Sequence, residues 1–427
     1  MLIIHNCTSL SDAFESYDTL ALTSLRAIMT VIGLMAAPKI QLKSVRSMQR
    51  NTPGLLDRQC TGYTSGVLAV TLLSGYHYTP WGVIPKQAKI KRNLQVGVQL
   101  EFATIPPYLT ALYSIKEGYN SEIRKLIRSV AMQEMIHMAQ VANILIAIGG
   151  VPRIDSKETV PSYPTVGLPG NVLPNLTVTL EKLTLQHVYK VFMGIEVPHN
   201  ESVTDNTTGE QIAENTIGQF YDSIAQCVTS LGNGIFNKST ANKQIQWPWP
   251  TKIGRVFIVT DVSSAVKGIQ EIKEQGEGAS PYDPTQGDTS SLAHFYKFEE
   301  IVCQKHLVKT IHGSYAYDGA DIPFDESGVW PMKDSPSSKD IPPENNCYTE
   351  AKAFHSAFRA LLRNIQDVFS GHLDGDTGMM SSITIMESMA VHARKLMWTK
   401  INPHDESSCG PVWDYEWTTP PAGAKNQ

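Results

Sequence analysis

The sequence predicts a mainly α-helical protein built on a four-helix bundle, with additional C-terminal helices and long loops. Apolar residues recur at intervals of three and four through several long segments, which is the spacing of one helix face. Acidic and imidazole side chains fall on the same faces, namely Glu101, then Glu134 with His137 three residues later. Because residues three apart share a helix face, Glu134 and His137 can reach one metal ion.

Length, charge and cysteine content set limits on the function. A chain of 427 residues can bury a large core. The net charge of −5, without a long basic run, gives no indication of a nucleic-acid partner. The six cysteines show no CxxC or CxxCH spacing, which argues against a zinc ribbon and a c-type haem. Cys347 and Cys409 lie in late loops and could pair, but we expect free thiols there.

The N-terminal part gives no firm membrane or export signal. Thr19 to Ala37 is apolar but carries Arg26 in its middle, and its strongest part is too short to span a bilayer. It also starts too far from Met1 for an ordinary signal peptide. We therefore expect an intracellular, cytoplasmic protein. The expected domains are an N-terminal extension over 1–85, partly disordered or an added helical arm, a helical domain over 86–417, and a tail over 418–427.

A regular helical period begins near residue 86. One helix carries Glu101 and the next carries Glu134, and their short connection predicts an antiparallel hairpin. A third helix should end beside Glu196, because a Val-Pro pair follows and the residue before proline disfavours the helical region. The other expected segments are a Pro-rich coil to about 176, a polar and loop-rich stretch over 200–250, a short strand over 256–260, an amphipathic helix over about 263–275, a fourth core helix over about 290–305, and two helices over about 349–370 and 378–399.

The acidic residues on these apolar faces indicate a metal site. A lone Glu-x-x-His arises by chance about once in a chain of this composition. A carboxylate that points into a core, however, costs several kcal/mol unless it is paired or bound to metal. The faces of Glu101 and Glu134 offer no Lys or Arg at matching spacing. Glu196 repeats the pattern at the end of the third helix, where the helix dipole disfavours a negative charge and a cation would neutralise it.

Two prolines lie just over one helical turn after Glu101. Pro106 and Pro107 remove two helical N–H groups, and their rings collide with the preceding turn. The carbonyls of Phe102 and Ala103 are therefore freed. We expect the helix to kink beside the metal site and to open a pocket.

The fourth helix completes the site only in part. A second Glu-x-x-His is the expected motif, but Ser291 stands three residues before His294. His294 itself is well placed on the apolar face. Glu299 and Glu300 are secondary candidates for the missing carboxylate, although each points more than a quarter-turn away from His294 on a helix.

Five other residues have roles that the pattern leaves open. His199, just after the third helix, is a candidate ligand or proton donor. Tyr108 and Tyr113 are candidates for lining the pocket, although aromatic residues at helical spacing are more often plain core. We expect His187 to be a hydrogen-bonded core residue and His392 to be structural.

Several segments together resemble the ferritin-like domains related to the violacein pathway's iminophenylpyruvate dimer synthase. They follow in order and cover most of residues 88–417. Two departures are Phe102, where many relatives have a histidine, and Ser291, where a carboxylate would complete the motif. The matching segments are Leu100–Ile115, Glu134–Met138, Ile148–Pro152, Ile195–Pro198, Val259–Asp261, Glu274–Gly278, His294–Ile301, Val329–Met332 and Gly410–Glu416.

The resemblance implies a ferritin-like bundle and a link to specialised metabolism. The dimer synthase is a much longer protein that contains haem, so its own reaction is not carried over. With the residues above, the resemblance predicts a non-haem di-iron oxidase or oxygenase that uses dioxygen on a small organic molecule. The expected cofactor is iron, either two ions per chain or one with an incomplete second site.

Each candidate residue has an expected role in this centre. Glu134 would bridge the ions, His137 and His294 would each bind one ion, and Glu101 and Glu196 would be terminal or bridging ligands. Glu134 and His137 are the expected catalytic residues. One alternative is a metal-binding or vestigial domain without redox turnover. Another is a metal-independent enzyme in which His137 or His294 acts as a general base.

Overall fold

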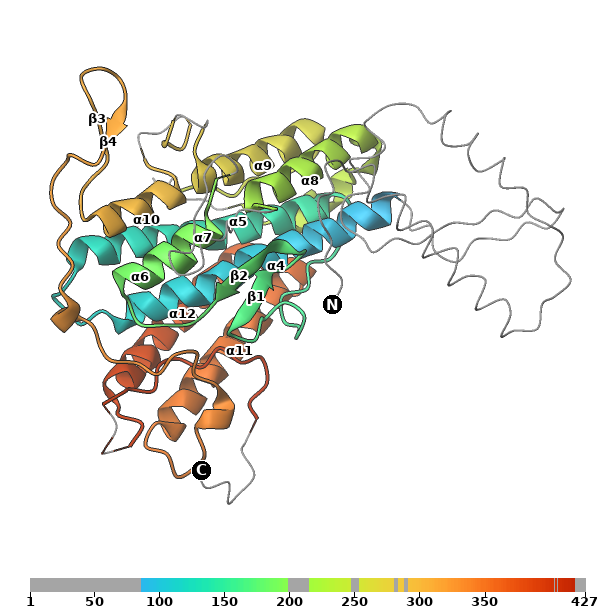
Figure 1. Ribbon diagram of the computed structural model, residues 1–427. Coiled ribbons are helices and arrows are strands. Elements are labelled where there is room, and N and C mark those ends of the chain that lie inside the picture. Colours follow the sequence, from blue (N-terminus) through green and yellow to red (C-terminus); the bar gives the residue numbers. More distant parts are fainter. Residues whose placement is uncertain are drawn as a thin grey trace, which may run out of the picture. The chain divides into compact units, whose positions relative to one another are not determined.

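The computed structural model describes residues 86–198, 215–246, 253–279, 283–287, 291–402, 404 and 406–418. The predicted extension over 1–85, His199 and the tail beyond residue 418 lie outside the described residues. Contacts divide the chain into two units, Met1–Arg58 and Gln59–Gln427, and every described residue belongs to the second. The described part is mainly helical, as predicted (Figure 1).

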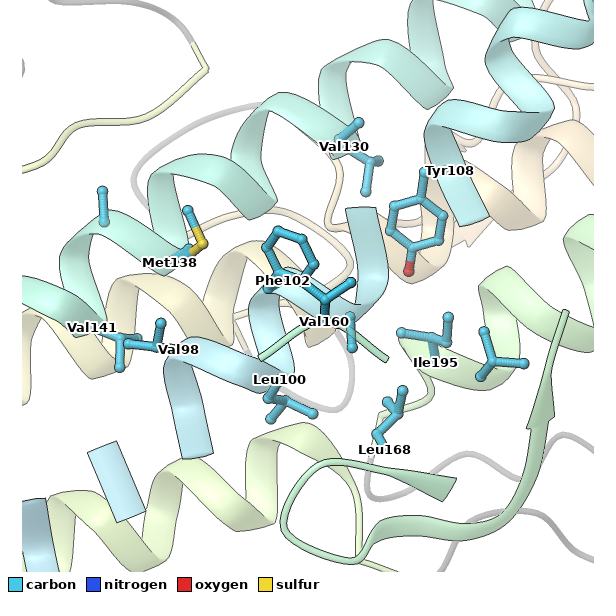
Figure 2. Close-up of a cluster of buried hydrophobic side chains, with 14 of the residues drawn as sticks. Val98, Leu100, Phe102, Tyr108, Val130, Met138, Val141, Val160, Leu168 and Ile195 are labelled. Atoms are coloured by element: carbon cyan, nitrogen blue, oxygen red, sulfur yellow. The ribbon is translucent and has the colours of Figure 1, made fainter. Parts of the chain in front are cut away.

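The first two core helices form the predicted hairpin. They are α4 (Lys86–Ser114) and α5 (Ser121–Ala147), and they pack along each other. Figure 2 shows Val98 of α4 together with Val130 and Val141 of α5 in one cluster of buried side chains. Because the apolar residues recur every three to four positions, one side of each helix is covered continuously by the other.

Helix α4 continues through its two prolines. The carbonyl of Ala103, which would have accepted a hydrogen bond from residue 107, instead accepts one of 2.7 Å from the Tyr163 hydroxyl. The predicted loss of a helical hydrogen bond is therefore compensated by a residue from a distant loop. All side chains from Glu101 to Tyr108 are buried, so this segment lies inside the core and not at the mouth of a pocket.

The third core helix is one run of three short segments. These are α6 (Leu185–His187), the π-helical turn η1 (Val188–Phe192) and α7 (Met193–Ile195), and the run ends at Glu196 as predicted. The fourth core helix, α10 (His294–Cys303), begins about four residues later than expected. Ser291 therefore precedes this helix, and the comparison with a helical Glu-x-x-His motif does not apply to it.

Among the described residues, two α-helices lie between the third and fourth core helices. The expectation of a polar, loop-rich stretch over 200–250 is wrong in part, because α8 (Ile217–Leu231) lies there and begins with a capping box between Thr216 and Gln219. The predicted amphipathic helix is α9 (Val262–Glu277). Helix α8 packs on α4 and α9 packs on α5, and the two also pack on each other (Figure 1).

The strand expected over 256–260 is not formed. Its backbone pairs with side-chain amides instead of a neighbouring strand, because Phe257 N–H donates to Gln140 and Val259 N–H donates to Gln244. The described residues also form two small hairpins, the first of them within the expected Pro-rich coil. They pair β1 (Thr165–Leu168) with β2 (Val172–Val178), and β3 (Val308–Lys309) with β4 (Tyr315–Ala316).

The predicted C-terminal helices are α11 (Tyr348–Ser370) and α12 (Gly375–Trp398), which pack against each other, with α12 also on α4. The C-terminal segment returns to the core, where the Trp413 indole N–H donates to Thr110 Oγ1 at 2.9 Å. Cys347 and Cys409 form a disulfide, so the expectation of free thiols is wrong here. The short 3-10 turns are η2 (Asn233–Ile235), η3 (Lys238–Lys243), η4 (Glu326–Gly328) and η5 (Ser338–Asp340).

None of the described helices combines the length and the apolar character that crossing a bilayer requires.

Candidate metal centre

Four segments of the bundle bring five predicted residues together. Glu101 comes from α4, Glu134 and His137 from one face of α5, Glu196 from the end of α7, and His294 from the first position of α10. They form two groups that share Glu134. The first trio is Glu101, Glu134 and His137, and the second trio is Glu134, Glu196 and His294.

In the first trio, an imidazole nitrogen faces two carboxylates. His137 Nδ1 lies 3.5 Å from Glu101 Oε2 and 3.7 Å from Glu134 Oε2. Ligand atoms about 2.0–2.2 Å from one ion are separated by about 3–4 Å when they are neighbours in its coordination shell. The three atoms are thus spaced as the ligands of one cation.

The second trio repeats this arrangement with the other oxygen of Glu134. His294 Nδ1 lies 2.7 Å from Glu134 Oε1 and 3.5 Å from Glu196 Oε2. The rings of His137 and His294 stack with centroids 5.4 Å apart. Glu134 therefore presents one oxygen to each trio, which is the geometry of a bridging carboxylate.

All five side chains are buried, with exposed fractions between 0% and 5%. Burial raises the pKa of Glu101 to about 8 and also raises the pKa of Glu196. Burial acts on Glu134 in the same direction, but the charges of His294 and His137 outweigh it and lower its pKa well below the ordinary value. Three buried carboxylates beside two imidazoles need protons or a cation to balance their charge.

Two polar atoms at the centre lack a suitable hydrogen bond. Glu134 Oε1 and His294 Nδ1 are inaccessible to solvent and make no hydrogen bond with the described residues, although they are 2.7 Å apart. Buried polar atoms are normally paired, and an orphaned one requires an explanation. A metal ion bound between an imidazole nitrogen and a carboxylate oxygen would satisfy both, so the residues present fit an iron-type centre.

Each terminal carboxylate accepts a hydrogen bond from a buried tyrosine. Tyr221 of α8 donates to Glu101 Oε1, and Tyr108 of α4 donates to Glu196 Oε1 at 2.6 Å. In Figure 2 the Tyr108 hydroxyl points towards Ile195, the residue before Glu196. Burial raises the pKa of both tyrosines well above the ordinary value, so their hydroxyls remain donors. Tyr108 was predicted as pocket lining, whereas Tyr221 was missed with its helix.

Each histidine is held at its other ring nitrogen by a glutamine. His137 Nε2 lies 2.8 Å from Gln275 Oε1, and His294 Nε2 lies 3.1 Å from Gln133 Oε1. An amide oxygen accepts only, so Nε2 carries a proton in both rings, and in the neutral imidazole the Nδ1 lone pair faces the carboxylates. The usable signal for Gln133 in the sequence is its position directly before Glu134.

The secondary acidic candidates lie apart from both trios. Glu300 Oε1 accepts the backbone N–H of Leu307 at 2.8 Å and lies 3.2 Å from His306 Nδ1. Glu299 Oε2 accepts a hydrogen bond from the Tyr317 hydroxyl. Neither carboxylate lies beside His294. This agrees with their angular positions on the helix, which pointed each of them away from His294.

The other candidates have structural surroundings. Burial raises the pKa of Tyr113, and the charge of Arg394 acts against this increase. Because Arg394 belongs to α12, Tyr113 lies towards that helix. The ring nitrogens of His187 are buried and make no hydrogen bond with the described residues, although Nδ1 lies 3.6 Å from Glu181 Oε2. This corrects the expected hydrogen-bonded role, and burial lowers the pKa of His187 to about 3. His392 Nδ1 lies 2.5 Å from Glu350 Oε1, a contact between α12 and α11.

Comparisons with known proteins agree with this architecture. Residues 94–303 match the family model described as Ferritin-like. The crystal structure of a ferritin-like protein from Caulobacter vibrioides is similar in fold, with a TM-score of 0.51 and 20% sequence identity, and the match covers 78% of this chain and 99% of that chain. No curated protein matches the chain. The described part of this chain therefore has a ferritin-like fold.

Proposed function

We propose that the two trios bind iron and that the protein is a non-haem oxidase or oxygenase acting on a small organic molecule. The single observation that carries the proposal is the position of Glu134, which directs one oxygen to His137 and the other to His294. A buried salt bridge would need only one carboxylate and one imidazole. A carboxylate shared between two histidine-containing trios is what a pair of adjacent metal ions requires.

Iron bound here would supply the electrons that reduce dioxygen during oxidation of the substrate. The protein residues would hold the ions and orient the ligands. Tyr221 and Tyr108 each restrain one terminal carboxylate, and Gln275 and Gln133 each restrain one imidazole. The burial of all five candidate ligands excludes bulk water from the centre. The resemblance to domains of specialised metabolism supports a small organic substrate.

The test is anaerobic reconstitution of the metal-free protein with Fe²⁺, followed by metal analysis and oxygen-uptake measurements. We expect bound iron and oxygen consumption in the wild-type protein, and loss of both in Glu134→Ala. Glu122→Ala is the matched control, because Glu122 lies on the same helix but at the surface. Failure of the reconstituted protein to bind iron, or activity that survives both chelation and Glu134→Ala, would refute the proposal.

A second candidate is a metal-binding domain without turnover. It is favoured by the burial of the whole centre, because His294 has an exposed fraction of 0% and Glu196 one of only 5%. The same reconstitution separates the two functions. Iron that is bound but consumes no oxygen with any aromatic or amine substrate tested supports the domain without turnover.

A further inference from the structure

The centre contains fewer negative charges than two divalent ions would require. Ferritin-like di-iron sites use four carboxylates and two histidines, which balance two divalent ions. The two trios here contain three carboxylates, Glu101, Glu134 and Glu196, and two histidines. Because ligands bind metal in their deprotonated forms, the three carboxylates supply a charge of −3. One positive charge would remain unbalanced with two divalent ions bound.

A buried lysine increases this imbalance. Lys297 has an exposed fraction of 6%, and its Nζ donates to Gln133 Oε1 at 2.8 Å. The same amide oxygen lies 3.1 Å from His294 Nε2, so the ammonium is connected to the second trio through one side chain. Gln286 Nε2 also donates to this oxygen, at 3.1 Å, which fixes the amide in place.

The charge of Lys297 acts on the second trio in particular. Burial lowers the pKa of Lys297 to about 8, against the opposing influence of Glu196, Glu134 and Glu300, so the group is an ammonium at neutral pH. After burial, the largest influences on the pKa of Glu101 come from His137 and Glu134. In the first trio, the glutamine that contacts the histidine is Gln275. Among the described residues, no lysine donates a hydrogen bond to Gln275 as Lys297 does to Gln133.

The charges balance with one divalent ion. Three carboxylates and one ammonium give −2, which one divalent ion neutralises and a second would exceed by two charges. An unbalanced buried charge is unfavourable, and Coulomb repulsion from Lys297 increases as the ion approaches it. The first ion should therefore occupy the first trio, because Lys297 is connected through Gln133 to His294 of the second trio.

We propose that Lys297 makes the two positions unequal, so that the first trio binds a divalent ion alone and the second trio binds one only together with a small anion. This inference rests on the proposed metal-binding function. Lys297 has a positioning role in this inference, because its charge determines which trio binds the first ion. The second position requires an additional anionic ligand that the protein does not supply, such as a small carboxylate. A carboxylate ligand would supply the negative charge that a fourth protein carboxylate supplies in other di-iron bundles.

The test is an anaerobic titration of the metal-free protein with Co²⁺ at pH 6.5, followed by visible absorption and calorimetry. We expect one tight equivalent in the wild-type protein and a second that binds at least tenfold more weakly. Formate should strengthen the second equivalent at least tenfold. In Lys297→Met the second equivalent should bind within about tenfold of the first, without formate.

Three further variants control the titration. Lys297→Gln removes the charge but keeps a hydrogen-bonding group, so it serves if Lys297→Met does not fold, and it should behave in the same way. Lys297→Arg keeps the charge and should behave as the wild type. Lys305→Met removes an exposed lysine that is paired with Asp321, and it should leave both equivalents unchanged.

The failures of the two proposals are distinguishable. If the wild-type protein binds two equivalents equally without formate, or if the neutral variants titrate as the wild type, the role of Lys297 is refuted and the metal centre stands. If no Co²⁺ binds to the wild-type protein, both proposals fall together.

Discussion

The first and second trios contain the same chemical groups but assemble them from different parts of the chain. Each has a terminal glutamate held by a tyrosine hydroxyl and a histidine held by a glutamine amide. In the first trio, the tyrosine and the glutamine come from α8 and α9, which pack on α4 and α5. In the second, they come from α4 and α5 themselves.

The difference between the trios lies in their surroundings. Glu196 and His294 lie at a helix end and a helix start, whereas Glu101 and His137 lie within long helices. A buried ammonium accompanies only the second trio among the described residues. Matching ligand sets therefore do not ensure matching affinity, because the charge around them also contributes to the binding energy.

The largest effect should follow from removing the shared residue. Glu134→Ala should weaken metal binding at both positions by at least 100-fold, because each trio loses a carboxylate. Glu101→Ala and Glu196→Ala should each weaken mainly one position. The measurement is competition with a chromophoric chelator, with circular dichroism as a check on folding. An equal effect of Glu101→Ala on both equivalents would contradict the division into two trios.

Removing the disulfide should lower the stability of the protein without changing metal binding at either trio. Cys347 and Cys409 are 62 positions apart, and a bridge that closes a loop of this length contributes about 4 kcal/mol in the chain-entropy description. Cys347→Ser should lower the free energy of unfolding by that order, measured with urea, without changing metal stoichiometry. Thiol counting on unfolded, unreduced protein should find two fewer thiols than after reduction, and equal counts would show that the bridge is absent.

The tyrosines test whether each trio is restrained independently. Tyr221→Phe should weaken the first position about tenfold, and Tyr108→Phe the second by a similar factor, because each releases one terminal carboxylate. Chelator competition on both variants measures the two effects. If Tyr221→Phe changed only the second equivalent, the assignment of donors to trios would be wrong.

The smallest effect is expected away from the centre, at the contact of α8 with α9. Burial raises the pKa of Glu277 to about 7, while the Gly218 N–H donates to its Oε1 at 2.9 Å. Between pH 4.5 and 7 the native state then holds more protons than the unfolded chain, so the free energy of unfolding falls as the pH rises through this window.

Glu277→Gln removes this titration. Urea unfolding at pH 5 and pH 8 should show a smaller difference in the free energy of unfolding for this variant than for the wild type. Glu271→Gln on the same helix, where Glu271 pairs with Arg255, is the control. An unchanged pH dependence in Glu277→Gln would exclude a role for this carboxyl group.

The sequence predicted the parts of this structure that depend on local periodicity. The hairpin of α4 and α5, α9 and the two C-terminal helices follow from apolar spacing, and the five central residues follow from charges on apolar faces. Helix α8 was missed although Phe220, Ile224 and Val228 recur at helical spacing, because the polar residues around them dominated the composition.

The supporting residues were not predictable in the same way. Tyr221 and Gln275 have no sequence relation to the glutamate and the histidine that they contact, 120 and 138 positions away. Nothing in the sequence around Lys297 indicates a contact with the centre. Its partner Gln133 is 164 positions away and comes next to it only in the folded protein. A pattern in the sequence identifies ligands by their own helix face, but partners from other helices are identified only when the packing is known.

The most direct test of the central claim is a crystal structure of the protein loaded with Co²⁺, with anomalous scattering used to locate the metal. We predict a strong peak between Glu101, Glu134 and His137, and a second peak between Glu134, Glu196 and His294 that gains occupancy when formate is added. Metal peaks away from Glu134, or no peak within reach of either trio, would contradict the account.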